Sequence, residues 1–309
     1  MRLKCRAVCA FVVCGVLALA GCSTGSSSTT PADPSISRVL DVVAAENFWG
    51  SIAADLGGKQ VRVTNIINSP NADPHDYEAT AADGRALASA NLVLVNGLGY
   101  DTWASKLTAA NPNPARTLLD VGNLLALPAD ANPHRWYNPA DVARVVDQLT
   151  ADYKELDPAD ADYFDQQNVA FQTTALAAYR SVIADIRTRY AGTAVGASES
   201  IFAMLAPALG LDLITPPSFL TAISQGADAT AADKKRIDEQ ISSRAMKVYL
   251  YNAQNATPDI QAQVTAAEAE GIPVSAITET LPAGAQSWQQ WQTTQLVALR
   301  DALAKATGK

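Results

Sequence analysis

The sequence of 309 residues contains only two histidines and four cysteines. Three cysteines, Cys5, Cys9 and Cys14, lie within the first 21 residues, and the fourth is Cys22. If that first segment is removed and Cys22 is modified, no thiol remains for a disulfide or a thiolate metal site. A metal site in this chain would therefore use imidazole or carboxylate ligands.

Basic residues are also scarce, with 23 Lys and Arg against 31 Asp and Glu and a formal charge of −8. This balance argues against nucleic acid as a partner, because phosphates select basic surfaces. No HExxH motif is present, and the one GxSxG match, GCSTG at residues 21–25, lies in the N-terminal segment rather than between a predicted strand and helix. Hydrophobic residues reach 48%, which is enough for a folded core.

The N-terminal segment has basic residues at positions 2, 4 and 6, an apolar run over 7–20 and small residues before Cys22. This pattern predicts a secretory signal peptide over residues 1–21. The quartet at 19–22, LAGC, resembles a bacterial lipobox, and the resemblance implies that Cys22 carries lipid as the first mature residue. Residues 22–36 are rich in Ser, Thr and Pro and predict a flexible tether. We therefore expect a lipoprotein anchored at the outer face of the cell membrane.

From residue 37 onward, short β-branched runs alternate with longer helical stretches. The runs predict strands at 39–45, 61–69, 91–97, 116–122, 193–198, 211–215, 246–252 and 273–278. Helices are expected near 47–58, 81–90, 101–110, 200–209, 230–243, 258–270 and 287–307. Such alternation is typical of βαβ units and of mostly parallel sheets.

Residues 157–191 contain no glycine and only one proline, at the start. They predict one long, rigid helix, with Asp157 as its cap and Pro158 at its first position. The predicted organisation is an α/β fold of two similar lobes with mostly parallel sheets, at 37–156 and 192–309, joined by this helix.

Both histidines directly follow a proline in a loop. His75 lies in NADPHDYEAT, after the second predicted strand, and His134 lies in ANPHRWYNP, after the fourth. Proline stiffens the backbone before each imidazole. Because imidazole is a common ligand for Zn, Cu, Fe and Ni, the shared pattern favours one metal site for both histidines.

These loops resemble those of the metal-specific solute-binding lipoproteins of bacterial ABC importers, the zinc and manganese receptor (ZnuA/PsaA-like) family. NADPHDYEAT is similar to the first ligand loop of that family, and the segment NGLGYDTW at 96–103 is similar to another of its motifs. ANPHRWYNP resembles the second ligand loop, except that Asn132 and Asn138 replace acidic residues. The matching positions are Asp73, Pro74, His75, Tyr77, Glu78 and Thr80 in the first loop, and Pro133, His134, Trp136 and Pro139 in the second.

The resemblance implies two further ligands in the second lobe. Glu199 occupies the ligand position in ASESIFAMLAPALGL, and Glu279 occupies it in ITETLP. For Glu199, a role as a cap of the following helix is the alternative. The outer-shell candidates for holding a histidine ring are Asp73, Asp76 and Glu78, and Trp136, Tyr77 and Phe202 are candidates for aromatic walls.

The resemblance implies an extracytoplasmic receptor that delivers a divalent metal ion to an ABC permease with its ATPase. It also implies a monomer that is not an enzyme. Two nitrogen and two carboxylate ligands suit both Zn²⁺ and Mn²⁺, so both ions are candidates. The alternatives are a secreted zinc-dependent hydrolase, which would use an open coordination position, and a surface lipoprotein adhesin.

Overall fold

The computed structural model describes residues 38–69 and 77–309. Two predictions, the lipidated Cys22 and the ligand His75, lie outside these described residues, as do the signal peptide and the whole tether. The described residues belong to one compact unit. Within the described part of the chain, no helix is both long and apolar enough to cross a membrane.

The first sheet is parallel, with strand order β2-β1-β3-β4. Its strands are β1 (Leu40–Glu46), β2 (Val61–Ile67), β3 (Leu92–Val95) and β4 (Thr117–Asp120). They alternate with helices α1 (Asn47–Gly57), α2 (Ala81–Ser89), α3 (Thr102–Ala110) and α4 (Val121–Leu124). β3 is buried along its whole length, as expected for a strand of a parallel sheet that is covered on both faces.

The second sheet repeats this topology in the order β6-β5-β7-β8, again all parallel. Its strands are β5 (Ala194–Ala197), β6 (Asp212–Leu213), β7 (Val248–Asn252) and β8 (Val274–Ile277). The helices are α8 (Ile201–Leu209), α9 (Pro217–Ser224), α10 (Ala231–Ser242), α11 (Pro258–Ala269) and α12 (Trp288–Thr307). The strand order reverses between β5 and β7, and such a switch point is where open α/β sheets usually bind ligands.

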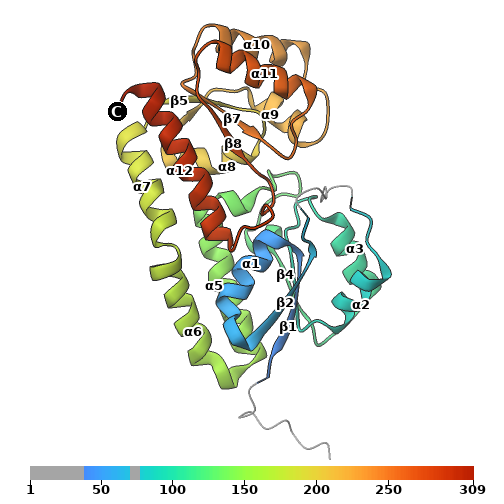
Figure 1. Ribbon diagram of the computed structural model, residues 1–309. Helices are drawn as coiled ribbons and strands as arrows, with labels where there is room; N and C mark the ends of the chain where they lie inside the picture. Colours follow the sequence, from blue (N-terminus) through green and yellow to red (C-terminus); the bar gives the residue numbers. More distant parts are fainter. Residues whose placement is uncertain (1–37, 70–76) are drawn as a thin grey trace, which may run out of the picture. The chain divides into compact units, whose positions relative to one another are not determined.

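The segment between the two sheets differs from the single helix that the sequence predicts. Helix α5 (Pro139–Leu156) comes first and was not predicted. It is followed by α6 (Ala161–Ala170), a π-helical turn (Phe171–Ala175) and α7 (Ala177–Tyr190). The predicted segment 157–191 is therefore helical over most of its length, but it begins with a 3₁₀ turn and carries a π-turn instead of being one regular α-helix. α12 packs along α7 in this region (Figure 1).

The predicted cap of that helix also has another role. No side-chain cap bond forms at Asp157. One of its carboxylate oxygens instead accepts the backbone N–H of Arg38 across 3.4 Å. Pro158 does stand at the first position of the short 3₁₀ turn that follows, where its missing N–H costs nothing.

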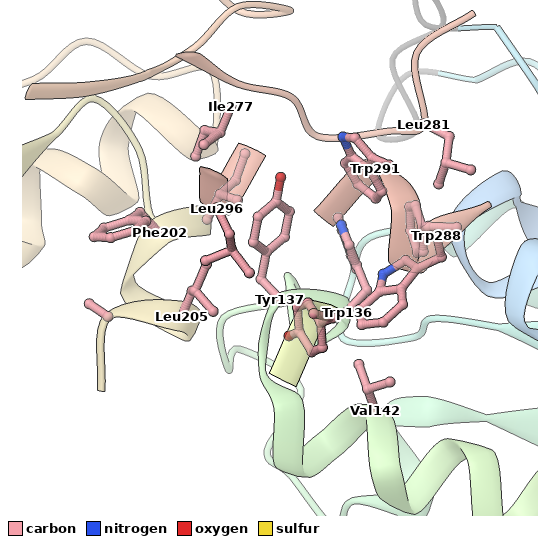
Figure 2. Close-up of a cluster of buried hydrophobic side chains, with 14 of the residues drawn as sticks. Trp136, Tyr137, Val142, Phe202, Leu205, Ile277, Leu281, Trp288, Trp291 and Leu296 are labelled. Atoms are coloured by element: carbon pink, nitrogen blue, oxygen red, sulfur yellow. The ribbon is translucent and has the colours of Figure 1, made fainter. Parts of the chain in front are cut away.

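Large apolar side chains from both halves share one continuous core. Figure 2 shows Trp136 and Tyr137 of the first half close to Trp288 and Trp291 of α12. Tyr137 meets Trp291 edge to face with ring centroids 5.7 Å apart, a favourable aromatic geometry. Burial raises the pKa of Tyr137, and its hydroxyl donates to the carbonyl of Thr278 across 2.6 Å. This core therefore fixes the chain that enters the candidate site.

Candidate metal centre

His134 is buried, with 1% of its surface exposed, and its loop is held from several sides. The carbonyl of Pro133 accepts a hydrogen bond from the amide of Asn96 across 3.0 Å. Arg135 forms a 2.6 Å ion pair with Asp141 at the start of α5. Trp136 stacks on Phe48 with ring centroids 3.8 Å apart. The loop is therefore rigid on both sides of the imidazole.

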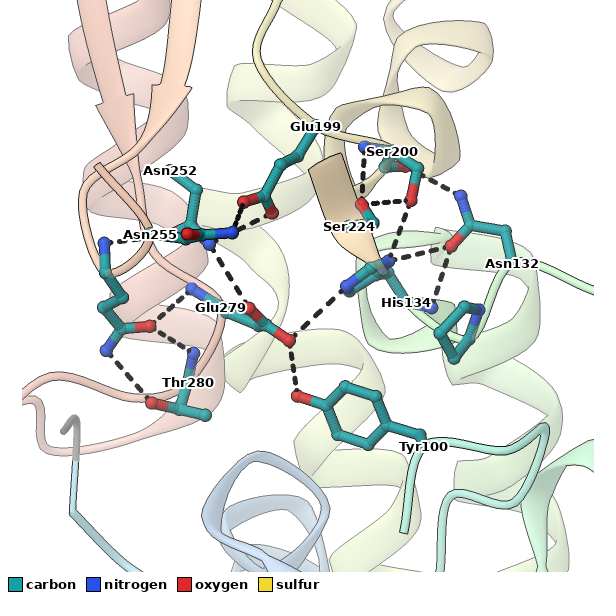
Figure 3. A network of polar contacts seen from close by, with 12 residues as sticks. Tyr100, Asn132, His134, Glu199, Ser200, Ser224, Asn252, Asn255, Glu279 and Thr280 are labelled. Atoms are coloured by element: carbon teal, nitrogen blue, oxygen red, sulfur yellow. Dashed lines mark hydrogen bonds and ion pairs between the residues drawn. The ribbon is translucent and has the colours of Figure 1, made fainter. Parts of the chain in front are cut away.

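The ring of His134 has a defined orientation (Figure 3). Its Nδ1 lies 2.8 Å from Oδ1 of Asn132, while the amide nitrogen of Asn132 donates to the carbonyl of Ser200 across 2.8 Å. That second bond assigns the amide oxygen to the imidazole, so Nδ1 carries the proton. Nε2 is the ring nitrogen that faces Oε1 of Glu279, at 3.5 Å.

Glu279 follows β8, but side chains of the first half hold it. Tyr100 donates its hydroxyl to Oε1 across 2.8 Å, and the indole N–H of Trp136 donates to the backbone carbonyl across 3.0 Å. Within its own half, Gln254 accepts the backbone N–H of Glu279 across 2.7 Å. Two chain segments far apart in sequence thus converge on one carboxylate.

Glu199 lies in the turn between β5 and α8 and is almost fully buried. Oε1 accepts a hydrogen bond from the amide of Asn255 across 2.6 Å, and Oε2 accepts one from Asn252 across 3.1 Å. The N-cap residue of α8 is Ser200, without a side-chain cap bond. The carboxylate of Glu199 therefore bonds the amides of Asn252 and Asn255 at and beyond the end of β7.

The amide nitrogen of Asn252 also lies 3.2 Å from Oε2 of Glu279, so it bridges the two glutamates (Figure 3). Among the residues that the structure describes, no three His, Cys, Asp or Glu side chains form a group that could hold a metal ion. His75, the remaining predicted ligand, is outside the described part of the chain.

The candidate aromatic walls and outer-shell acids lie in different environments. Trp136 lies edge to face with His134, with ring centroids 5.2 Å apart, and Phe202 is fully buried. Tyr77 packs on Trp103, with centroids 4.8 Å apart. Glu78 is exposed, while Asp73 and Asp76 lie outside the described residues. The side chain that contacts Nδ1 of His134 is instead Asn132. This is one of the two positions where the sequence departs from the family pattern.

The fold and this polar centre together define a two-sheet α/β protein with candidate ligands gathered beyond the carboxyl ends of its strands. The chain belongs to the ZnuA family, zinc-uptake complex component A, periplasmic, whose model matches residues 42–302. The family resemblance inferred from the two histidine loops is therefore confirmed, as is the α/β class with parallel sheets.

Individual relatives are more distant. The manganese-binding lipoprotein MntA of Halalkalibacterium halodurans is 26% identical over 163 residues, which are 52% of this chain and 53% of the relative. MntA of Bacillus subtilis is 29% identical over 166 residues, 50% of this chain and 51% of the relative. The chain thus spans about half the length of these curated relatives.

Among solved structures, the cadmium-bound periplasmic metal binding protein from Candidatus Liberibacter asiaticus has a TM-score of 0.72. The match covers 85% of this chain and 99% of the other at 17% sequence identity. At that identity the likeness shows the fold alone.

Proposed function

We propose that this protein is an extracytoplasmic receptor for a divalent transition-metal ion, Zn²⁺ or Mn²⁺. It would bind the ion through His75, His134, Glu199 and Glu279 and deliver it to an ABC-type import permease. The lipid on Cys22 would hold the receptor at the membrane. The family description names zinc uptake, and the two relatives above are named for manganese binding, so both ions belong in the proposal.

The observation that carries the proposal is the distance of 3.5 Å between Nε2 of His134 and Oε1 of Glu279. Two ligand atoms that each lie about 2.0–2.1 Å from one zinc ion at a tetrahedral angle are about 3.4 Å apart. The two atoms thus have the spacing of neighbouring ligands of one ion. Tyr100 and Asn252 are neutral donors, so they orient Glu279 without cancelling its charge.

The proposal assigns no catalytic residue. The hydrolase and adhesin alternatives are tested by separate assays of turnover and of surface adhesion. Turnover of an ester or a peptide would support the hydrolase. Metal-dependent stabilisation without turnover supports the receptor.

Thermal unfolding of the purified, chelator-treated protein tests the proposal. An ion that binds only the folded state adds about 4 kcal/mol of stability at a thousandfold excess over Kd. We expect this gain with Zn²⁺ or Mn²⁺ in the wild type and its loss in His134→Ala and Glu279→Gln. Glu268→Gln, at an exposed position, is the matched control and should keep the full gain. A wild-type protein that neither ion stabilises would overturn the proposal.

A further inference from the structure

Asn252 is the last residue of β7 and is completely buried. β7 pairs with β5, so Asn252 stands at the switch point of the second sheet, close to the turn that carries Glu199. Its amide oxygen accepts the backbone N–H of Gln254 across 2.9 Å. Because this bond identifies the oxygen, the amide nitrogen must be the atom that faces the glutamates.

An amide nitrogen carries two hydrogens, and here each has a carboxylate acceptor. One contact is 3.1 Å to Oε2 of Glu199, and the other is 3.2 Å to Oε2 of Glu279. The hydrogen-bonding capacity of Asn252 is therefore filled on both sides. A single rigid side chain sets the distance between two candidate metal ligands from different loops (Figure 3).

We propose that Asn252 is the residue that sets the metal preference of the site, an inference that rests on the proposed function. By holding Oε2 of Glu279, it leaves Oε1 as the oxygen that faces His134. A carboxylate whose second oxygen accepts a hydrogen bond does not easily rotate to coordinate an ion through both oxygens. Asn252 therefore keeps the coordination number low.

A low coordination number discriminates between the two candidate ions. Zinc is satisfied by four ligands in a tetrahedral arrangement, whereas manganese favours octahedral, oxygen-rich sites. Without the bridge, Glu199 and Glu279 can turn and bind through both oxygens. The loss of Asn252 should then cost zinc more affinity than manganese, and the ratio of the two affinities should fall.

Asn255 offers a matched control. Its amide donates to Oε1 of Glu199 across 2.6 Å, and the structure records no bond from it to Glu279. Asn255→Ala removes one donor from the site but leaves the bridge in place. It frees Oε1 of Glu199 alone, so it should change the zinc-to-manganese affinity ratio less than Asn252→Ala does.

The test is competitive titration of Zn²⁺ and Mn²⁺ into the full protein and into Asn252→Ala and Asn252→Asp. Asn252→Asp keeps the shape and the acceptor for Gln254 but places a third carboxylate beside Glu199 and Glu279, so circular dichroism of both metal-free variants first checks that they fold. We expect zinc affinity to fall about 10–100-fold, the range typical of outer-shell changes, and manganese affinity to fall less. The intense visible absorption of four-coordinate Co²⁺ should weaken in both variants.

The outcomes separate the two proposals. Metal binding by the wild type with an unchanged zinc-to-manganese ratio and an unchanged cobalt spectrum in both variants would overturn the role of Asn252 and leave the receptor function standing. Failure of the wild type to bind either ion would overturn both.

Discussion

The hydroxyl of Tyr100 donates to Oε1 of Glu279 across 2.8 Å, joining residues 179 positions apart. The same oxygen faces Nε2 of His134. Tyr100 follows β3 of the first sheet, and Glu279 follows β8 of the second. One carboxylate oxygen thus receives an aromatic hydroxyl and an imidazole from the opposite half of the chain.

Tyr100→Phe should weaken binding of the preferred metal about 10-fold, because it removes one donor that orients the carboxylate of Glu279. Isothermal titration measures this change. Tyr163→Phe is the control, since that hydroxyl accepts the backbone N–H of Lys59 and not a candidate ligand. Equal affinities for the two variants would show that the phenol has no role in the site.

Asn132 holds the ring of His134 through Nδ1. Asn132→Asp should raise metal affinity, because a carboxylate acceptor makes the imidazole a stronger ligand. Asn132→Leu should lower affinity about 10-fold or more, because it leaves the ring tautomer unfixed. The Kd values of the two variants, measured at one pH and ionic strength, check both directions. A result in which both variants match the wild type would contradict the assigned ring orientation.

Glu46, at the end of β1, and Asp101, at the start of α3, form a buried acidic pair. Burial, and then the charge of Asp101, raises the pKa of Glu46 well above 4.5. Burial raises the pKa of Asp101 from 3.8 to about 6, although the backbone N–H groups of Asn96 and Gly97 oppose this shift.

An acid whose folded-state pKa is raised favours folding in its protonated form. The unfolded chain loses its proton first as the pH rises, so the pair's contribution to stability falls from about pH 4 to beyond pH 6. Glu46→Gln should therefore raise the Tm of the metal-free protein at pH 8 and change it little at pH 4. Calorimetry at several pH values measures this difference, with Glu268→Gln as the control. A difference in Tm that does not depend on pH would refute the assignment.

Two helical glycines predict opposite effects on stability. A Cβ on Gly57 would lie 2.3 Å from Cβ of Val61, whereas a Cβ on Gly84 would have no neighbour nearer than 3.6 Å. Gly57→Ala should cost about 1–3 kcal/mol through overpacking. Gly84→Ala should gain about 0.5–1 kcal/mol through reduced chain entropy. Urea unfolding of both variants gives the comparison, and a gain for Gly57→Ala would contradict the packing of α1 on β2.

Periodicity and turn residues predicted the strands of both sheets because each is a short apolar run between turns. The same reasoning missed α5, although Asn138 caps it and Pro139 occupies its first turn. Both residues were assigned to the histidine loop by the family resemblance, so Asn138 was not recognised as a helix cap. The π-turn was missed because Phe171–Ala175 contains neither glycine nor proline, so its cause lies in tertiary packing rather than in local propensity.

In the candidate site, too, some residues could be predicted from the sequence and others could not. Loop chemistry and family resemblance pointed to His134, Glu199 and Glu279, and the structure brings these three into one network. Asn252 could not be recognised from sequence, because an asparagine at the end of a strand usually reads as a turn residue. Its role depends on β7 lying beside β5, which is a property of the sheet order alone.

Anomalous diffraction from crystals of the zinc- or manganese-loaded protein addresses metal binding most directly. We predict one ion, with Nε2 of His134 and oxygens of Glu199 and Glu279 about 2.0–2.2 Å away. His75 should supply the second imidazole. An ion bound elsewhere, with none of these side chains at coordination distance, would contradict the proposed receptor site.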